Sequence, residues 1–480
     1  MKEFEFKQIN NKIPLLLNKN DSGLIFILFL FNVGSVKEDE KIAGISHFLE
    51  HVIFGPSKNY NGDNIPIKYM GNNAIDYNAF TSKENTGFYL SSNKKNFEKM
   101  LNIIYDILTN PLFDINEIEK ERKIVFEEKA NMKDGPGELA AEEYYEILFD
   151  NLPLSKTIIG TDKSLKDINR EDLVNYFNKY YKDQNNISIC LSGDYDNNFI
   201  DLLNNKFKNF IKDNINYKNK YLKYKVKYEK LTGGSITSIV PLLLGTFLLS
   251  NINTNNNINK DLNKKIILPY HKNIIKSKFE KTYINLTYKC NVKDEYVLDL
   301  ISNLLTHGLS SILSFKLREH YNLIYNINSS SNIYTNNGYF GIYTNTEKFD
   351  SVELIINTII DSLNELKELK FKDIKKNKFK YIDDELINSN KMLIENNLLK
   401  LQLNHQSLGQ YMLLQFFIYK NRINNEIKTF PEELQIKNII KKYNSITKND
   451  IIDVAKRTFI PENLCITTVC SKNFKYKFNI

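Results

Sequence analysis

Two histidines and a glutamate lie close together near the start of the chain, in the stretch His47-Phe48-Leu49-Glu50-His51. Residues four positions apart project from the same face of a helix, so both imidazoles can bind a single metal ion. Glu50 comes directly before the second histidine, which reverses the more frequent His-Glu-x-x-His order. From this position its carboxylate still points towards the metal side and can take a proton from a metal-bound water.

The types of these side chains favour zinc. Neutral imidazole and carboxylate groups suit this ion, and a catalytic zinc site combines three protein ligands with a water molecule. Zinc lowers the pKa of that water to about 7, which makes hydroxide available at neutral pH. A third protein ligand is therefore expected, and the acidic segment 114–149 offers many candidates. Composition does not choose among them, and histidine pairs with this spacing also occur on helices that bind no metal.

The motif is predicted to lie on a helix at 44–55 that follows an apolar run at 23–34. This run is typical of a strand buried on both faces, and it is too short to span a bilayer as a helix. The following segments predict strands at 86–92 and 187–192, helices at 95–110 and 171–182, and a helical region at 114–149 that is broken at Gly135-Pro136-Gly137.

A similar pattern returns between about 280 and 472. Strands are predicted at 283–290, 338–345 and 464–469, and helices at 296–306, 311–320, 352–368, 372–421 and 448–458. Because this order resembles that of residues 20–192, we expect two domains of similar topology, at 1–214 and 276–480. The predicted fold class is α+β, in which each domain is a mostly antiparallel sheet covered by helices.

The segment 215–275 is interpreted as a linker that carries an insertion. A Lys/Tyr-rich helix candidate at 217–231 is followed by an apolar, uncharged stretch at 236–252 and by an Asn-rich tract. The apolar stretch has about the minimum length of a membrane-spanning helix but contains Pro241 and Gly245. A packed or mobile insertion is favoured, and a membrane contact through 236–252 is the alternative.

The overall composition narrows the classes of function. The 480 residues carry a net charge of +8, which is mild for this length, and no nucleic-acid-binding module accompanies it, so no nucleic acid is expected as a partner. The four cysteines form no paired metal motif, and buried free thiols suit a reducing compartment. Residues 1–8 resemble neither a secretory signal nor a mitochondrial transit peptide, so we expect a cytoplasmic location.

The stretch around the two histidines resembles the insulinase/pitrilysin family of zinc metallopeptidases, which includes the mitochondrial processing peptidases. Gly44, the segment His47 to His51, and Phe54 match the family's G-x-x-H-F-L-E-H-x-x-F stretch. The resemblance covers about 10–210 and 280–470. It implies a metalloendopeptidase with one zinc ion per chain, which acts on short or unfolded polypeptides held in extended form.

The family's third zinc ligand is a glutamate in a helical segment like E-R-x-x-I-x-x-E, which residues 121–128 match. The 76 residues from 52 to 127, between the second histidine and Glu128, reproduce the family's spacing. The resemblance therefore assigns this ligand to Glu128, with Glu127 as the alternative. Glu121 resembles the family's acid that orients a ligand histidine.

Two further segments match the family outside the metal site. Asn78-Ala79-Phe80-Thr81, followed by Glu84 and Thr86, resembles an N-A-x-T-x-x-E-x-T segment. In the family this is an edge strand to which substrate adds through backbone hydrogen bonds. Leu317-Arg318-Glu319 with Tyr325 resembles an L-R-E-x-x-x-L-x-Y pattern. The family uses this arginine and tyrosine to hold substrate and to stabilise the developing oxyanion.

The resemblance also implies an assembly, because half-size chains of the family pair to enclose a chamber. We therefore expect a homodimer in which Arg318 and Tyr325 act with Glu50 as catalytic residues across the dimer. A heterodimer is the alternative assembly. A catalytically inactive scaffold or partner subunit of a processing-peptidase-like complex is the alternative function.

The linker at 215–275 is longer than the family's usual linker. Its segment KYLKYKVKYEKLTGG is similar to a Tyr/Lys-rich segment that recurs in proteins of giant DNA viruses. A viral origin is therefore a hypothesis, and it would place the chain in the host cytoplasm or in the virion. The remaining histidines, His271, His307, His320 and His405, have no metal-ligand spacing and are expected in ordinary roles.

Overall fold

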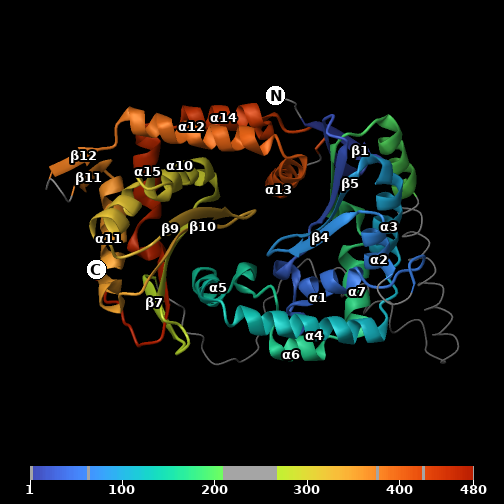
Figure 1. Ribbon diagram of the computed structural model, residues 1–480, viewed down its shortest axis with the longest axis horizontal. Helices are drawn as coiled ribbons and strands as arrows, with labels where there is room; N and C mark the ends of the chain where they lie inside the picture. Colours follow the sequence, from blue (N-terminus) through green and yellow to red (C-terminus); the bar gives the residue numbers. More distant parts are fainter. Residues whose placement is uncertain (1–3, 62–64, 209–267, 374–377, 424–426, 479–480) are drawn as a thin grey trace, which may run out of the picture.

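The structure is a computed structural model that describes residues 4–61, 65–208, 268–373, 378–423 and 427–478. Two sheets dominate it, each covered by helices (Figure 1). The first sheet has the strand order β1-β2-β6-β3-β5-β4, and the second has the order β7-β13-β8-β10-β9. In each sheet a single parallel pair, β2 with β6 and β13 with β7, interrupts otherwise antiparallel pairing. The predicted class of two helix-covered, mostly antiparallel domains is confirmed.

The first half contains the strands β1 Glu5–Ile9, β2 Ile13–Lys19, β3 Leu24–Phe31, β4 Asp76–Thr81, β5 Thr86–Asn93 and β6 Ile187–Gly193. Its α-helices are α1 Ile45–Ile53, α2 Ile65–Asn72, α3 Phe97–Thr109, α4 Ile115–Met132, α5 Pro136–Leu148, α6 Asp162–Asp167 and α7 Arg170–Tyr180. Strand β4 stands at the edge of its sheet and pairs only with β5 among the described strands.

The second half contains the strands β7 Tyr270–Ile275, β8 Thr282–Cys290, β9 Ile327–Ile333, β10 Gly338–Thr346 and β13 Leu464–Cys470. Its α-helices are α10 Glu295–Thr306, α11 Val352–Leu366, α12 Asp384–Leu401, α13 His405–Ile423, α14 Ile436–Ser445 and α15 Lys448–Thr458. A separate two-stranded ribbon is formed by β11 Lys370–Asp373 and β12 Lys378–Tyr381.

Strand β3 explains why the apolar run is almost unbroken. Successive side chains of a strand point to opposite faces of its sheet. One face of β3 contributes Ile25, Ile27, Phe29 and Phe31 to a core formed with helices of the first half. The other face contributes Phe26, Leu28 and Leu30 to a core that continues through the second half. Both faces of the strand must therefore be apolar.

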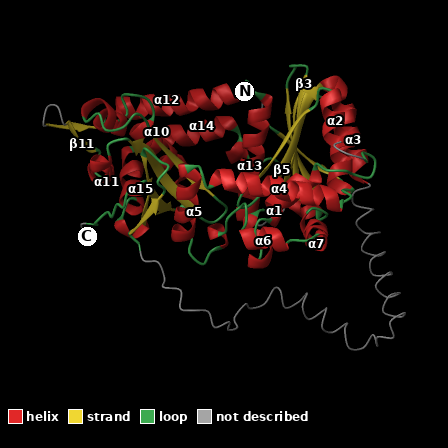
Figure 2. Cartoon of the chain, turned by 60° about the horizontal axis from the view of Figure 1, so that its bottom comes forward, coloured by secondary structure: helices red, strands yellow, loops and turns green. Residues whose placement is uncertain are grey.

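Each half contributes a helix that packs on the sheet of the other half. Helix α13 of the second half packs on β6, β3 and β2 of the first sheet, while α5 of the first half packs on β13, β8 and β7 of the second. The turned view in Figure 2 shows the first sheet between α3 and α13. Each sheet is thus covered on one face by a helix from the opposite half, and the core on that face includes residues of both halves.

The structure corrects several expectations. Residues 314–320, within a predicted α-helix, form a π-helix. The predicted helical region 372–421 overlaps the β11–β12 ribbon and includes a break before His405 that separates α12 from α13. Residues 270–275, which were assigned to the linker, form β7 and pair in parallel with β13. The local pattern does not reveal that partner, which follows much later in the chain.

The helix candidate at 217–231 and the apolar stretch at 236–252 lie outside the described residues. Among the residues that the structure does describe, none of the helices combines the length and the apolar character needed to cross a membrane.

Helix α13 packs closely on the first sheet at Gly409. A Cβ atom there would lie 3.1 Å from Sγ of Cys190 and 3.2 Å from the ring of Phe26, so a larger side chain has no room. We predict that Gly409→Val lowers the free energy of unfolding by ~1–3 kcal/mol. Urea unfolding would measure this, with Gly71→Val as the control because Gly71 faces open space. An equal loss in both variants would contradict the prediction.

Candidate metal centre

Helix α1, which carries the histidine motif, is held at its N-terminus by a buried carboxylate. The Oε2 atom of Glu38 accepts a hydrogen bond from the backbone N–H of Gly44 at 2.6 Å, and Oε1 accepts one from Ser46 at 2.9 Å. Unpaired N–H groups and the helix dipole both favour a negative charge at this position. Burial raises the pKa of Glu38, whereas the hydrogen bonds from Ser46 and Gly44 oppose that rise.

The turn that leads into α1 requires glycine at position 44. Gly44 has a φ of +89°, and a Cβ atom there would lie 2.6 Å from the carbonyl oxygen of Ile159. From this start the helix buries Phe48, Leu49 and Val52 in the core of the first half. The helical period then places the motif's polar side chains on another face of the helix, which packs against α4.

The two histidines converge on one carboxylate. The Nε2 atoms of His47 and His51 each lie 3.5 Å from Oε2 of Glu128 on α4. One ligand atom from each of the three residues lies within 4.8 Å of the other two. Glu127, the alternative ligand, is exposed and is not part of this group. The structure therefore brings together the three residues that the sequence and its family resemblance selected.

The donor set suits a zinc ion. The Nδ1 atom of His51 lies 3.2 Å from Oε2 of Glu121, so an N–H at Nδ1 leaves the Nε2 lone pair directed at the shared centre. Two imidazoles and one carboxylate are the ligands of many catalytic zinc sites. The residues present therefore fit the metal that the family resemblance implies.

The carboxylates make the surroundings of His51 negative. Burial alone would lower the pKa of His51, but Glu121 and Glu128 outweigh this effect and raise it to about 9. For His47, burial together with the neighbouring His51 lowers the pKa to about 4. The two histidines therefore differ in their preference for a proton.

Glu50 lies on the same helix and is paired with the edge strand. Burial raises the pKa of Glu50, and a hydrogen bond from Thr81 opposes the rise. The Thr81 hydroxyl donates this bond to Oε2 of Glu50 at 2.5 Å. Thr81 was expected to contact substrate as part of the segment 78–81. The structure places its side chain on Glu50, and the segment itself lies in the edge strand β4 beside α1. Contact of this segment with substrate stays a prediction.

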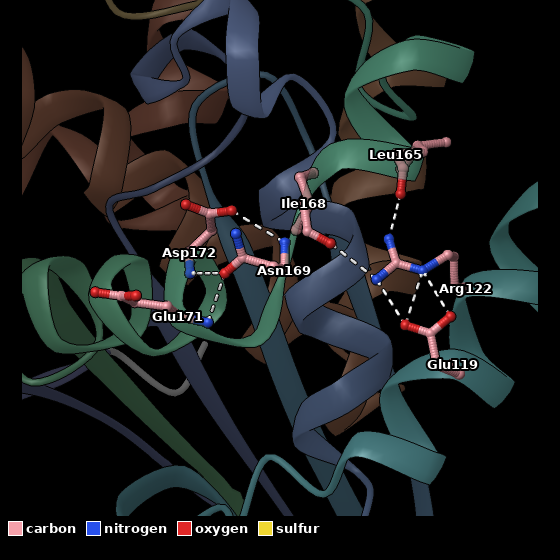
Figure 3. A network of polar contacts seen from close by, with 7 residues as sticks. All are labelled: Glu119, Arg122, Leu165, Ile168, Asn169, Glu171 and Asp172. Carbon is pink, nitrogen blue, oxygen red and sulfur yellow. Dashed lines mark hydrogen bonds and ion pairs between the residues drawn. The ribbon is translucent and has the colours of Figure 1, made fainter.

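Helix α4 is fixed by Arg122, which the sequence analysis matched only as part of a motif. Figure 3 shows its guanidinium donating to the carbonyl oxygens of Leu165 and Ile168 and pairing with Glu119. The same guanidinium lies 5.0 Å from the ring centre of Phe48 on α1. Arg122 therefore connects α4, which carries Glu121 and Glu128, both to the α6–α7 connection and to the histidine helix.

Arg318 and Tyr325 lie in the second half. The guanidinium of Arg318 stands 5.2 Å from the ring centre of Tyr325, whose side chain is 76% exposed. The π-helix that carries Arg318 is anchored by the buried Lys316, which pairs with Glu365 of α11 at 2.5 Å. Within the described part of the chain, no hydrogen bond or ion pair joins Arg318 or Tyr325 to the metal-binding group.

Comparison with known proteins matches two consecutive family regions. Residues 21–162 match the family described as Insulinase (Peptidase family M16), and residues 167–378 match the Peptidase M16 inactive domain. A protein of Rickettsia felis named "Uncharacterized zinc protease" is 27% identical over 465 residues, which is 96% of each chain. The beta subunit of the mitochondrial-processing peptidase of Saccharomyces cerevisiae is 35% identical over 151 residues, or 32% of each chain.

Solved structures support the fold. A protease from Helicobacter pylori superposes with a TM-score of 0.74 at 17% identity and covers 98% of this chain and 100% of its own. A peptidase M16 inactive domain from Pseudomonas fluorescens superposes with a TM-score of 0.72 at 13% identity, covering 99% and 100%. The chain therefore carries the N-terminal and the C-terminal domain of the insulinase family, peptidase family M16.

Proposed function

We propose that this chain is a zinc-dependent metalloendopeptidase that hydrolyses short or unfolded polypeptides held in extended form. The observation that carries the proposal is the meeting of His47, His51 and Glu128 beside Glu50 and next to an open sheet edge. The matched family and the relatives named as zinc protease and processing peptidase support the same class of reaction.

In this proposal His47, His51 and Glu128 hold one zinc ion per chain. Glu121 keeps His51 in the tautomer that offers Nε2, through its contact with Nδ1. When bound, a zinc ion supplies a Lewis acid that activates water and polarises the carbonyl of the scissile peptide. Glu128 is half exposed, so the proposed centre is accessible to solvent at this residue.

Glu50 is the general base of the proposed reaction. Its carboxylate accepts a proton from the attacking water and later donates it to the leaving amine nitrogen, so one residue serves as base and then as acid. The hydroxyl of Thr81 occupies Oε2, which leaves Oε1 to exchange the proton. That hydrogen bond also fixes the direction in which the carboxylate faces.

Strand β4 is the proposed substrate-binding element. Backbone groups alternate in direction along a strand, so every second residue of the segment 78–81 offers its N–H and C=O to an extended peptide at the free edge. The Ala79 N–H donates to Oδ1 of Asn78 at 2.8 Å, and a bound peptide would replace that contact. Such pairing reads the substrate's backbone more than its side chains, and a folded protein has few strands free to take part. Broad specificity for flexible segments follows from this mode of binding.

Arg318 and Tyr325 are proposed to act on the zinc centre of a second copy in a homodimer. Tyr325 is strongly exposed and its ring centre lies 5.2 Å from the Arg318 guanidinium, so the pair is available to another molecule. Two similar proteins are parts of larger assemblies. One is the beta subunit of the mitochondrial-processing peptidase, and the other is a chain of complex III from Candida albicans. These likenesses support the proposal that this chain also assembles with a partner. A heterodimer would use the same surface.

Zinc affinity can distinguish Glu128 from Glu127 as the third ligand. We predict about one zinc ion per chain, with zinc affinity lowered ~10–100-fold in Glu121→Gln and further in Glu128→Gln. Titration against a competing chelator would measure these affinities. Glu127→Gln is the matched control, because it removes an adjacent and exposed carboxylate. Equal losses in Glu127→Gln and Glu128→Gln would refute the assignment.

Replacing Glu50 by glutamine removes the base without removing a ligand. We predict a ~10²–10⁴-fold fall in kcat for Glu50→Gln with its zinc content unchanged. A quenched fluorescent peptide library, assayed with and without a chelator, would measure the cleavage and locate the cut sites. Wild-type chain that holds zinc and cleaves no peptide would support the scaffold function instead. Cleavage that survives chelation would count against a metallopeptidase.

Mixing two inactive variants tests action across a homodimer. In random mixing of Glu50→Gln and Arg318→Ala chains, half of the dimers are hybrids, and each hybrid retains one intact site. We therefore predict recovery of about a quarter of the wild-type activity. Peptide cleavage after subunit exchange would measure it, with each variant mixed with itself as the control. A mixture as inactive as its components would argue that the pair acts within one chain.

A further inference from the structure

The turn between β4 and β5, residues 82–85, has a fixed shape. The hydroxyl of Ser82 accepts hydrogen bonds from the backbone N–H groups of Glu84 at 3.3 Å and Asn85 at 3.1 Å. The backbone of Ser82 also donates to the carbonyl oxygen of Asn85 at 2.8 Å, and Lys83 accepts at its carbonyl from Val36 at 2.9 Å. A force on one residue of this turn is therefore transmitted to the others.

The two side chains at the centre of the turn contact different halves of the molecule. Lys83 is buried in the first half, where its ammonium donates to the carbonyl of Lys156 and lies 4.2 Å from the ring centre of Tyr145. Glu84 extends to the second half, where it accepts from the backbone N–H of Thr335 at 2.9 Å and from the Thr335 hydroxyl at 3.0 Å. The turn is thus held from both sides.

Thr335 lies at the tip of the β9–β10 hairpin. Its N–H and hydroxyl bind Glu84, whereas its carbonyl oxygen binds Arg422 of α13. The guanidinium donates from Nε to the carbonyl of Thr335 and from Nη2 to the carbonyl of Tyr334, each at 3.0 Å. Glu84, Thr335 and Arg422 form what we call the interdomain clasp. Its two charged members have opposite signs, so the buried carboxylate of Glu84 has compensation within the clasp.

The start of the same turn reaches the proposed base. Thr81 immediately precedes Ser82, and its hydroxyl donates to Oε2 of Glu50 at 2.5 Å. A hydrogen bond of this length tolerates little displacement. The position of Glu50 therefore depends on where the turn lies, and the position of the turn depends on the clasp.

We propose that the C-terminal domain positions the general base of the N-terminal domain in the same chain, through the clasp, the turn and Thr81. This inference rests on the proposed function, because it assigns Glu50 the role of base. Thr81, Glu84, Thr335 and Arg422 are then positioning residues, and the region matched as an inactive domain contributes to the rate of reaction without supplying a ligand or a base.

Steady-state peptide cleavage by the full-length zinc-loaded chain tests the proposal. We expect Thr81→Val and Glu84→Ala each to lower kcat about 10-fold while KM changes by less than about 2-fold, because a misplaced base slows the chemical step. Glu84→Gln retains an acceptor for the Thr335 N–H and restores most of the rate. Thr335→Val, which removes only the hydroxyl donor, lowers kcat in the same direction but less.

The double variant identifies the route. If Glu84 acts through Thr81, adding Glu84→Ala to Thr81→Val lowers kcat by less than about 2-fold further. Asn421→Ala is the matched control, since Asn421 neighbours Arg422 on α13 and bonds across the halves to Asn32 rather than to the turn. It should leave kcat unchanged. Zinc content and thermal unfolding of every variant identify any loss caused by misfolding.

Three outcomes would overturn the inference: additive losses in the double variant, a loss confined to KM, or an equal fall of kcat in Asn421→Ala. Failure of the proposed function has a different signature. In that case the wild-type chain binds zinc and cleaves no peptide, so activity is absent even without a substitution.

Discussion

The Nε2 atoms of His47 and His51 lie 3.5 Å from the same oxygen of Glu128, although two helices and two strands separate α1 from α4 along the chain. The helix propensity of either segment alone cannot fix the distance between residues of α1 and α4. That distance depends on the packing of two helices whose facing side chains are polar, and polar surfaces contribute little apolar burial to hold them. The structure meets this requirement with contacts around the centre. Arg122 ties α4 to the ring of Phe48, and Glu38 holds the first turn of α1.

The edge strand is held by a second set of contacts. Strand β4 has a partner on one side only, and edge strands are open to other chains. An edge that must bind peptides needs free backbone groups but also a fixed position relative to the metal centre. The turn after β4 supplies that position, because Lys83 and Glu84 anchor it to opposite halves of the molecule. The strand therefore combines an open edge with a firmly held end.

Much of this arrangement was predictable from the sequence where the signal is local or closely spaced. The apolar run predicted β3, because both faces of that strand are buried, and the histidine spacing predicted a polar face on α1. Composition could not select Glu128 among the acids of 114–149, and only the family spacing did so. The role of Glu38 and the contact of Thr81 with Glu50 were missed, since each joins elements whose relation is set by tertiary packing. The π-helix at 314–320 was missed because one extra residue in a turn leaves the apolar pattern nearly unchanged.

The exchange of helices between the halves has a consequence for biosynthesis. Helix α13, which covers one face of the first sheet, ends at Ile423, far beyond the last strand of that sheet. A nascent chain that has emerged only as far as β6 has all the proposed metal ligands but lacks one wall of the core around β3. Domains usually fold in order as they leave the ribosome, but here the first must wait for the second. We therefore expect the proposed metal centre to form only after α13 has been synthesised.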